Sequence, residues 1–253
     1  MLRMKSNLAG IIPIAGPKTD IEMPWHHTMM PFDRNKVLIQ NSVYTCAMAG
    51  CKSIWIVCND DIQPIIKSVV GDQIQDPVYK HRSFAKFAKD HQRSIPIFYV
   101  PMPLRDLHRR NNYAFSAVHG CLTANKIFGQ ISTYLAPEQF FISWPYAIVN
   151  SQSFRDYRQD IQKKSILFDC EGKNIFTNDY VPLTCNIDEV RQIKDYCYEL
   201  QNPYSLNKCL TDLQPSELLE PLKCKDLISI NCEYNKVANW KDYTLLLAKK
   251  SVI

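Results

Sequence analysis

The chain has 253 residues and a formal net charge of +5, with 46% hydrophobic and 22% charged residues. A chain of this length buries a sizeable core and its composition is ordinary for a globular protein, so we expect one folded domain rather than a disordered or fibrous chain. The mild basic excess lacks the concentrated positive stripe of a dedicated nucleic-acid binder, so sequence-specific nucleic-acid binding is not expected.

The first 70 residues predict a strand, a helix, a second strand and a second helix. Residues 8–15 form a short β-branched run, which turn-forming residues and a proline-punctuated loop follow. Apolar residues recur at helical spacing over 35–49, and Gly50 stands at the position of a helix C-cap. The continuous apolar run 53–58 predicts a strand buried on both faces, and 62–70 predicts the next helix. This order favours a mainly parallel sheet covered by helices.

The middle of the chain continues the same alternation. Residues 71–93 are polar and irregular, which indicates an excursion from the sheet. Residues 95–100 predict a third strand, 113–129 a helix rich in small residues, and 140–144 a fourth strand. A basic loop, 101–112, joins the third strand to the helix.

The last hundred residues predict a β-hairpin, two helices and one more strand. These elements are a hairpin of 165–169 with 174–177 around Glu171 and Gly172, a helix over 188–200 capped by Asn186 or Asp188, a strand over 227–232 and a helix over 239–249. We therefore predict a single three-layer α/β domain with a mainly parallel sheet and a C-terminal hairpin-helix extension. Within it, we expect 1–150 to form a nucleotide-binding core and 151–253 to form the acceptor side and the extension.

The cysteines and the hydrophobic runs bear on the compartment. Ten cysteines lie scattered through apolar segments without CxxC pairs, which favours buried free thiols over disulfides or a metal site. The first apolar run is short and Pro13 interrupts it, so neither a signal peptide nor a membrane span is expected. These features predict a protein of the reducing cytoplasm, with no membrane association.

Two long stretches of the sequence resemble one enzyme family. They are IIPIAGPKTDIEMPWHHTMMPF at 11–32 and NSVYTCAMAGCKSIWIVCNDDIQPIIKSVVGD at 41–72. Together with RRNNYAFSAVHGCLTANKI, FFISWPY and VANWKDYTLLL further on, they resemble the sugar-1-phosphate nucleotidyltransferases, which have a GT-A-like α/β fold. IWIVCNDD and the later DPVY also resemble proteins of tailed phages that infect marine bacteria, where the host cytoplasm would be the location.

The resemblance implies a set of nucleotide-binding residues. The turn after the first strand corresponds to the family's phosphate loop, the loop before the central helix to its base-recognition loop, and the end of the fourth strand to its metal-binding strand. The residues implied are Ala15, Gly16, Lys18, Arg109, Arg110, Asn111 and Asn112. Trp144 and Tyr146 are added as aromatic residues able to stack on a base or a sugar. An exposed basic loop remains open for 108–112, as does core packing for the two aromatic residues.

The same resemblance implies Mg²⁺ bound with a nucleoside triphosphate, but both of the family's metal-binding aspartates are missing. Residues 143–146 contain no carboxylate, and Ala238 stands at the second position. The family's glycine-rich signature is reduced to Gly16 followed by Pro17, which has no amide hydrogen. Asp60 and Asp61 follow a strand and are the candidate replacement ligands, with helix capping as the alternative.

Other candidate residues have simpler explanations. Adjacent His26 and His27 rarely converge on one ion, so a loop pair without metal is favoured. Asp169 and Glu171 are interpreted as a solvated hairpin rather than a paired-carboxylate site.

Two functions follow from these patterns. The first is a divergent nucleotidyltransferase that uses a nucleoside triphosphate and a sugar phosphate. The second is a catalytically degenerate scaffold that binds a nucleotide, a nucleotide sugar or a protein partner, including a second copy of the chain. The sequence leaves open whether the protein is an enzyme.

Overall fold

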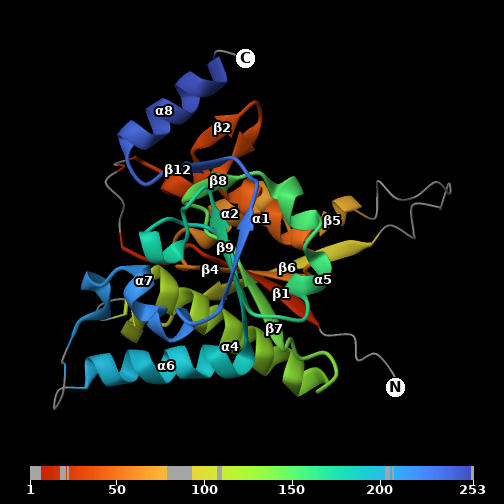
Figure 1. The fold of residues 1–253 in the computed structure, drawn as a ribbon, viewed down its shortest axis with the longest axis vertical. Helices are drawn as coiled ribbons and strands as arrows, with labels where there is room; N and C mark the ends of the chain where they lie inside the picture. Colours follow the sequence, from red (N-terminus) through yellow and green to blue (C-terminus); the bar gives the residue numbers. More distant parts are fainter. Residues whose placement is uncertain are drawn as a thin grey trace.

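The fold is built on one eight-stranded sheet with helices on both faces (Figure 1). The computed structural model describes residues 7–17, 21, 23–78, 93–106, 110–202, 206 and 208–251. The sheet has the strand order β11-β9-β10-β7-β1-β4-β6-β5. Its strands are β1 Leu8–Pro13, β4 Ser53–Cys58, β5 Gln73–Gln75, β6 Ser94–Pro101, β7 Gln139–Ile142, β9 Ile166–Cys170, β10 Leu183–Asn186 and β11 Asp226–Ile230. Two small sheets pair β2 Pro31–Asp33 with β3 Lys36–Val37, and β8 Ala147–Val149 with β12 Tyr234–Lys236.

The centre of the sheet is parallel and its flanks are mixed. Strand β1 pairs in parallel with both β4 and β7, and β4 pairs in parallel with β6. Strands β5 and β10 run antiparallel to their neighbours β6 and β7, while β11 is parallel to β9. The predicted mainly parallel α/β sheet is confirmed.

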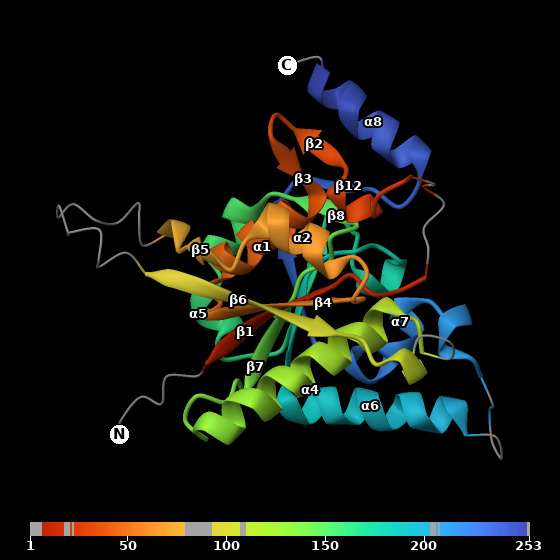
Figure 2. The ribbon, with the colours of Figure 1, turned by 180° about the vertical axis from the view of Figure 1, so that it is seen from behind.

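The helices cover both faces of the sheet. They are α1 Leu38–Ala49, α2 Gln63–Val70, α4 Tyr113–Ile131, α5 Arg158–Ile161, α6 Ile187–Gln201, α7 Pro215–Leu218 and α8 Trp240–Ser251. Helices α4 and α6 lie side by side on one face, and α1 and α2 lie on the opposite face (Figures 1 and 2). Within the described residues, no helix is both long enough and apolar enough to cross a bilayer.

Strand β4 shows why its sequence is apolar at every position. Trp55 and Val57 pack into the core beneath α4, whereas Ile54, Ile56 and Cys58 pack into the core beneath α1. Since successive side chains of a strand point to opposite faces, a strand covered on both sides needs an unbroken apolar run.

Several local predictions are confirmed by backbone geometry. Gly50 ends α1 with φ 94°, the left-handed conformation that glycine adopts without steric cost. Asn186 rather than Asp188 caps α6, because its side chain accepts a hydrogen bond from the amide of Glu189 at 2.9 Å.

The predicted hairpin between 165–169 and 174–177 is wrong. Residues Ile175–Thr177 form a short 3-10 helix, in which the Asn174 side chain accepts a hydrogen bond from the Phe176 amide. Strand β9 pairs instead with β10 and β11, so the turn at Glu171 and Gly172 closes a single bridge. The cap at Asn174 ends the extended backbone before a second strand begins.

The expectation that all cysteines are free thiols is also wrong for one pair. Cys170 at the end of β9 and Cys232 after β11 form a disulfide, while the eight others are free. Six of the free thiols are buried, as expected for small hydrophobic side chains.

Candidate functional site

The sheet has a topological switch point between β1 and β7. From β1 the chain moves through β4 to β6 on one side, and then returns past β1 to β7 on the other. In open α/β sheets, ligands bind outside the carboxyl ends of the strands at such a point. The candidate site therefore comprises the turn after β1, the segment after β7 and the N-terminal end of α4.

The turn after β1 is held tightly by its neighbours. The amides of Ile14 and Ala15 both donate to the carbonyl of Val57, at 2.8 and 3.0 Å. The Ala15 carbonyl accepts a hydrogen bond from the Ser116 hydroxyl on α4. Both backbone polar groups of Ala15 are thus engaged within the protein. Of the next two residues only Gly16 has a backbone amide hydrogen, because Pro17 lacks one.

The ring of Tyr113 packs directly on Gly16. A Cβ atom added at Gly16 would lie 2.1 Å from two carbons of that ring, so only glycine permits this approach. The Tyr113 hydroxyl donates to the Pro17 carbonyl at 2.7 Å. The glycine in this turn therefore accommodates an aromatic ring of the same chain.

Aromatic rings continue from Tyr113 across the switch point. The ring centroids of Tyr113 and Tyr146 lie 4.2 Å apart, and those of Tyr146 and Tyr180 lie 5.1 Å apart. The Tyr146 hydroxyl donates to the Ile14 carbonyl at 3.0 Å. Burial raises the pKa of both Tyr113 and Tyr146, so these phenols stay protonated at neutral pH.

The two aromatic residues after β7 are part of the core. Trp144 is 2% exposed and Tyr146 is 1% exposed. The Trp144 indole donates to the Val181 carbonyl at 3.1 Å. In this conformation neither ring presents a face on which a base could stack, so a stacking role needs these side chains to move.

Two histidines pack against the same aromatic cluster. The ring of His27 lies 4.9 Å from that of Tyr146 and 4.3 Å from that of His26. Burial lowers the pKa of His26 to about 4, with Asp61 opposing the shift, and burial together with His26 lowers the pKa of His27 to about 3. Both imidazoles are therefore neutral at pH 7.

Parts of the predicted base-recognition loop are engaged within the fold. Arg110 pairs with Asp106 at 3.0 Å and donates to Gln201 at 2.7 Å. Asn112 caps α4 by accepting from the Ala114 amide, and its amide nitrogen donates to the carbonyls of Leu210 and Leu213. Arg110 thus joins the loop before α4 to α6, and Asn112 joins the start of α4 to the segment at Leu210 and Leu213. Lys18 and Arg109, which were also predicted to bind nucleotide, lie outside the described residues.

Three buried polar atoms around the switch point have no hydrogen-bond partner among the described residues. They are Nε2 of His27, Oδ1 of Asn59 directly after β4, and Oδ1 of Asn111 just before α4. The sequence analysis did not single out Asn59, which directly follows the apolar run 53–58. Its position after an apolar strand was the available signal, but its burial depends on the packed loops around it.

The predicted metal ligands are not gathered into a site. Asp60 and Asp61 are exposed, and Asp61 Oδ1 accepts a hydrogen bond from the Ile62 amide at 3.0 Å. Among the described residues, no group of three or more histidine, cysteine or acidic side chains could hold a metal ion. Because Mg²⁺ requires several oxygen ligands, the donors of the described residues do not by themselves form a magnesium centre.

The other candidate carboxylate pair has a structural role. Asp169 is buried and accepts hydrogen bonds from the Gly172 amide at 2.9 Å and the Asn174 side chain at 3.2 Å. It shapes the turn after β9, while Glu171 adopts φ 55° within that turn.

Comparison with known proteins identifies the class of fold. No protein-family model and no curated protein sequence matches this chain. Solved structures do match, and they show that the chain has a nucleotidyltransferase-like α/β fold. The neighbours reported below are nucleotidyltransferases that act on sugar phosphates and related substrates.

Three of these structures define the likeness. A protein assigned as a glucose-1-phosphate thymidylyltransferase from Bacillus anthracis has a TM-score of 0.63 at 11% identity, over 97% of this chain and 96% of its own. A UDP-glucose pyrophosphorylase solved with UDP-glucose has a TM-score of 0.57 at 11% identity, over 98% and 99%. A 4-diphosphocytidyl-2C-methyl-D-erythritol synthase from Anaerococcus prevotii has a TM-score of 0.55 at 14% identity, over 97% and 96%. The expected phage source stays a prediction.

Proposed function

We propose that this protein binds a nucleotide or a nucleotide sugar at the switch point between β1 and β7. The observation that carries the proposal is that one side-chain atom each of His27, Asn59 and Asn111 is buried without a hydrogen-bond partner among the described residues. Each such atom costs about 1–3 kcal/mol when it is left without a partner. A ligand that hydrogen-bonds to them would recover that cost.

The chemistry of these atoms favours recognition of a base or a sugar. Neutral His27 offers either a donor or an acceptor at Nε2, according to its tautomer, while the two asparagine oxygens accept. A nucleobase amine, an imide or a sugar hydroxyl provides matching groups. Arg110 is engaged by Asp106, so phosphate binding in this proposal depends on Lys18 and Arg109.

Because the described donors do not by themselves form a magnesium centre, we propose binding without a metal held by the protein's own side chains. The first candidate is accordingly the catalytically degenerate form of the fold, with a protein partner or a second copy of the chain as further predicted partners. The second candidate is retained nucleotidyl transfer, which the likeness to pyrophosphorylases favours. In that case Mg²⁺ would be held by the triphosphate together with Asp60 and Asp61.

The test is the thermal unfolding midpoint with each ribo- and deoxyribonucleoside triphosphate and common nucleotide sugars, with and without Mg²⁺. Binding raises the midpoint by mass action, so a specific ligand gives a concentration-dependent shift. The shift should be lost in His27→Phe and Asn111→Leu. Ser42→Ala is the matched control, because Ser42 also has an unpartnered buried oxygen but lies on α1.

The outcomes separate the two candidates. A shift that does not require Mg²⁺, without pyrophosphate release, supports the degenerate binder. A magnesium-dependent shift with pyrophosphate release, abolished in Asp60→Asn or Asp61→Asn, supports the transferase. A flat panel, or a shift unchanged in both site variants, rejects the proposed site.

A further inference from the structure

A sizeable cavity lies away from the switch point. It measures about 520 Å³ and is bounded by α1, the β2–β3 hairpin, the segment after β8, and the segment from the end of α2 to β5. These elements lie together on the face of the sheet that α1 and α2 cover (Figure 2). None of the predicted nucleotide-binding residues that the structure describes lines it. Its volume falls within the range of about 300–1,000 Å³ that is usual for small-molecule sites.

The cavity combines apolar walls with carboxamides. Phe32, Val43 and Val149 are buried and supply part of the apolar lining. The polar lining consists largely of amide side chains, namely Asn35, Gln40, Asn41, Gln73, Asn150 and Gln152. A hydrophobic wall with a few convergent polar groups is the usual composition of a ligand site.

Four polar side chains of the lining have hydrogen-bonding groups that no other described residue engages. Asn41 donates to the Val149 carbonyl at 3.4 Å, which leaves its side-chain oxygen. The side-chain oxygen of Asn150 accepts from the backbone amide of Gln152 at 3.1 Å, which leaves the NH₂ group of Asn150 available to a ligand. Gln152 donates to the Tyr44 hydroxyl at 3.4 Å, which leaves the Gln152 oxygen and the Tyr44 O–H. Two donors and two acceptors therefore remain for a ligand.

The cavity has little charge to offer. Among the described residues, the one charged residue of the lining is Lys36, which pairs with Asp33 at 3.2 Å. A phosphate or carboxylate ligand would lack the arginine fork or cluster of cations that such groups usually require. An apolar partner would leave the four polar groups facing hydrocarbon, at a cost for each. A neutral ligand whose groups both donate and accept fits the cavity better than either.

We infer that this cavity binds an uncharged saccharide of one or two rings. Sugar hydroxyls donate and accept at the same atom, and they match the Tyr44, Asn41, Asn150 and Gln152 groups. The C–H faces of a sugar ring match the apolar lining beside Phe32. The site is separate from the nucleotide site proposed above and does not depend on it.

The experiment is titration of the full-length protein with glucose, N-acetylglucosamine, maltose and sucrose, with uridine and adenosine as non-saccharide probes. Binding is followed through the NH₂ signals of asparagine and glutamine side chains in ¹⁵N-resolved NMR spectra. Titration to about 10 mM fills nine-tenths of a site with a Kd of about 1 mM. We expect saturable shifts with at least one saccharide.

Matched variants tie binding to the cavity. Tyr44→Phe removes one donor and keeps the ring, and Gln152→Leu removes an exposed carboxamide, so each should weaken the Kd about tenfold while the unfolding midpoint stays unchanged. Tyr134→Phe is the control, since Tyr134 is 88% exposed and lies outside the lining. His27→Phe should leave saccharide binding intact, which separates this site from the nucleotide site.

Three results would overturn the inference. One is the absence of saturable shifts with all four saccharides. Another is binding that neither Tyr44→Phe nor Gln152→Leu weakens. The third is preferential binding of uridine or adenosine in the cavity.

Discussion

Lowering the pH should destabilise this protein through His27, and the size of the effect follows from burial. His27 is 6% exposed, and its pKa is about 3 in the folded protein against 6.5 for the unperturbed side chain. Because the folded pKa lies below the unfolded one, the unfolded chain takes up the proton first. The stability that neutral His27 contributes is complete above about pH 6.5 and is lost as the pH falls toward 3.

The magnitude can be worked out for a fall from pH 6.5 to pH 5. Each pH unit between the two pKa values is worth about 1.4 kcal/mol, so 1.5 units correspond to about 2 kcal/mol of lost unfolding free energy. His27→Phe removes the titrating group and keeps a ring against Tyr146. The wild type should therefore lose about 2 kcal/mol more than this variant over the interval.

The assay is urea unfolding of both proteins at half-unit steps between pH 7.5 and pH 5, with the unfolding free energy extrapolated to zero denaturant. The other titrating groups, including His26, are present in both proteins, so the difference between the curves reports His27. Parallel curves would refute the reasoning, because they would mean that His27 is protonated equally readily in the folded and the unfolded states.

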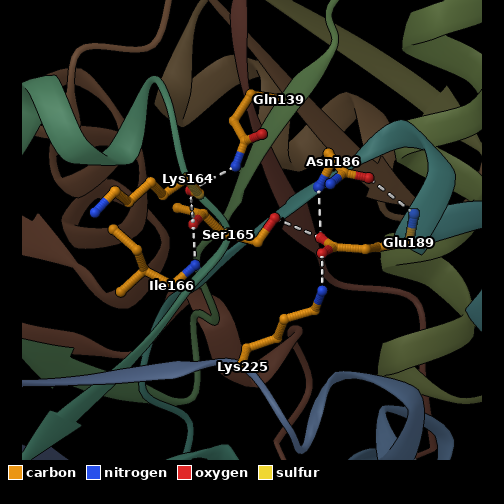
Figure 3. Close-up of polar contacts among 8 residues, drawn as sticks. Gln139, Lys164, Ser165, Ile166, Asn186, Glu189 and Lys225 are labelled. Atoms are coloured by element: carbon orange, nitrogen blue, oxygen red, sulfur yellow. Dashed lines mark hydrogen bonds and ion pairs between the residues drawn. The ribbon is translucent and has the colours of Figure 1, made fainter.

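Three further predictions concern packing and buried charge. Gly16→Ala should cost about 1–3 kcal/mol of stability because its Cβ would meet the Tyr113 ring. The control Gly129→Ala, whose nearest contact is at 3.9 Å, should be neutral or stabilising, and equal thermal unfolding midpoints for the two variants would contradict this. Arg158→Met should lower the unfolding free energy by about 3 kcal/mol in urea, because Arg158 pairs with buried Asp76 at 3.3 Å and donates to the Ala47 carbonyl at 2.9 Å. A decrease smaller than that of the exposed control Arg191→Met would argue against this. Glu189→Gln should cost about 1–3 kcal/mol of stability, since buried Glu189 pairs with Lys225 and accepts hydrogen bonds from the Ser165 hydroxyl and the Asn186 amide (Figure 3). An unchanged thermal unfolding midpoint would show that these contacts of Glu189 do not stabilise the protein.

Much of the central sheet could be predicted because its signals are local. The unbroken apolar run of β4, the C-cap glycine at Gly50 and the small-residue helix α4 each carry their pattern within a few residues. Strand β10 went unpredicted because it has only four residues and no distinct alternation. Its extended conformation depends on pairing with β7 and β9, of which β7 is distant in sequence.

The sheet topology brings together two of the predicted nucleotide-binding segments, while their contacts depend on the fold. The turn at Gly16 and the segment at Trp144 and Tyr146 both lie at the switch point, and their role in binding stays a prediction. Arg110 pairs with Asp106 and bonds to α6, and the Tyr113 ring packs on Gly16 at the place expected for a phosphate. The spacing of residues along the sequence does not predict either contact. These contacts join residues distant in sequence. The division of the chain at residue 150 stays a prediction, although the sheet takes strands from both sides of that position.

By itself the sequence determined the order of strands and helices, the two-sided burial of the sheet and the absence of the expected family aspartates. Such features depend on local pattern and on which side chains are present at all. Only the tertiary structure decided which polar groups are paired and which are buried without a partner, which cysteines are joined, and where a cavity opens beside α1. Those properties depend on neighbours that the fold supplies from distant parts of the chain. Whether a buried polar atom finds a hydrogen-bond partner depends on which of these neighbours lie within reach.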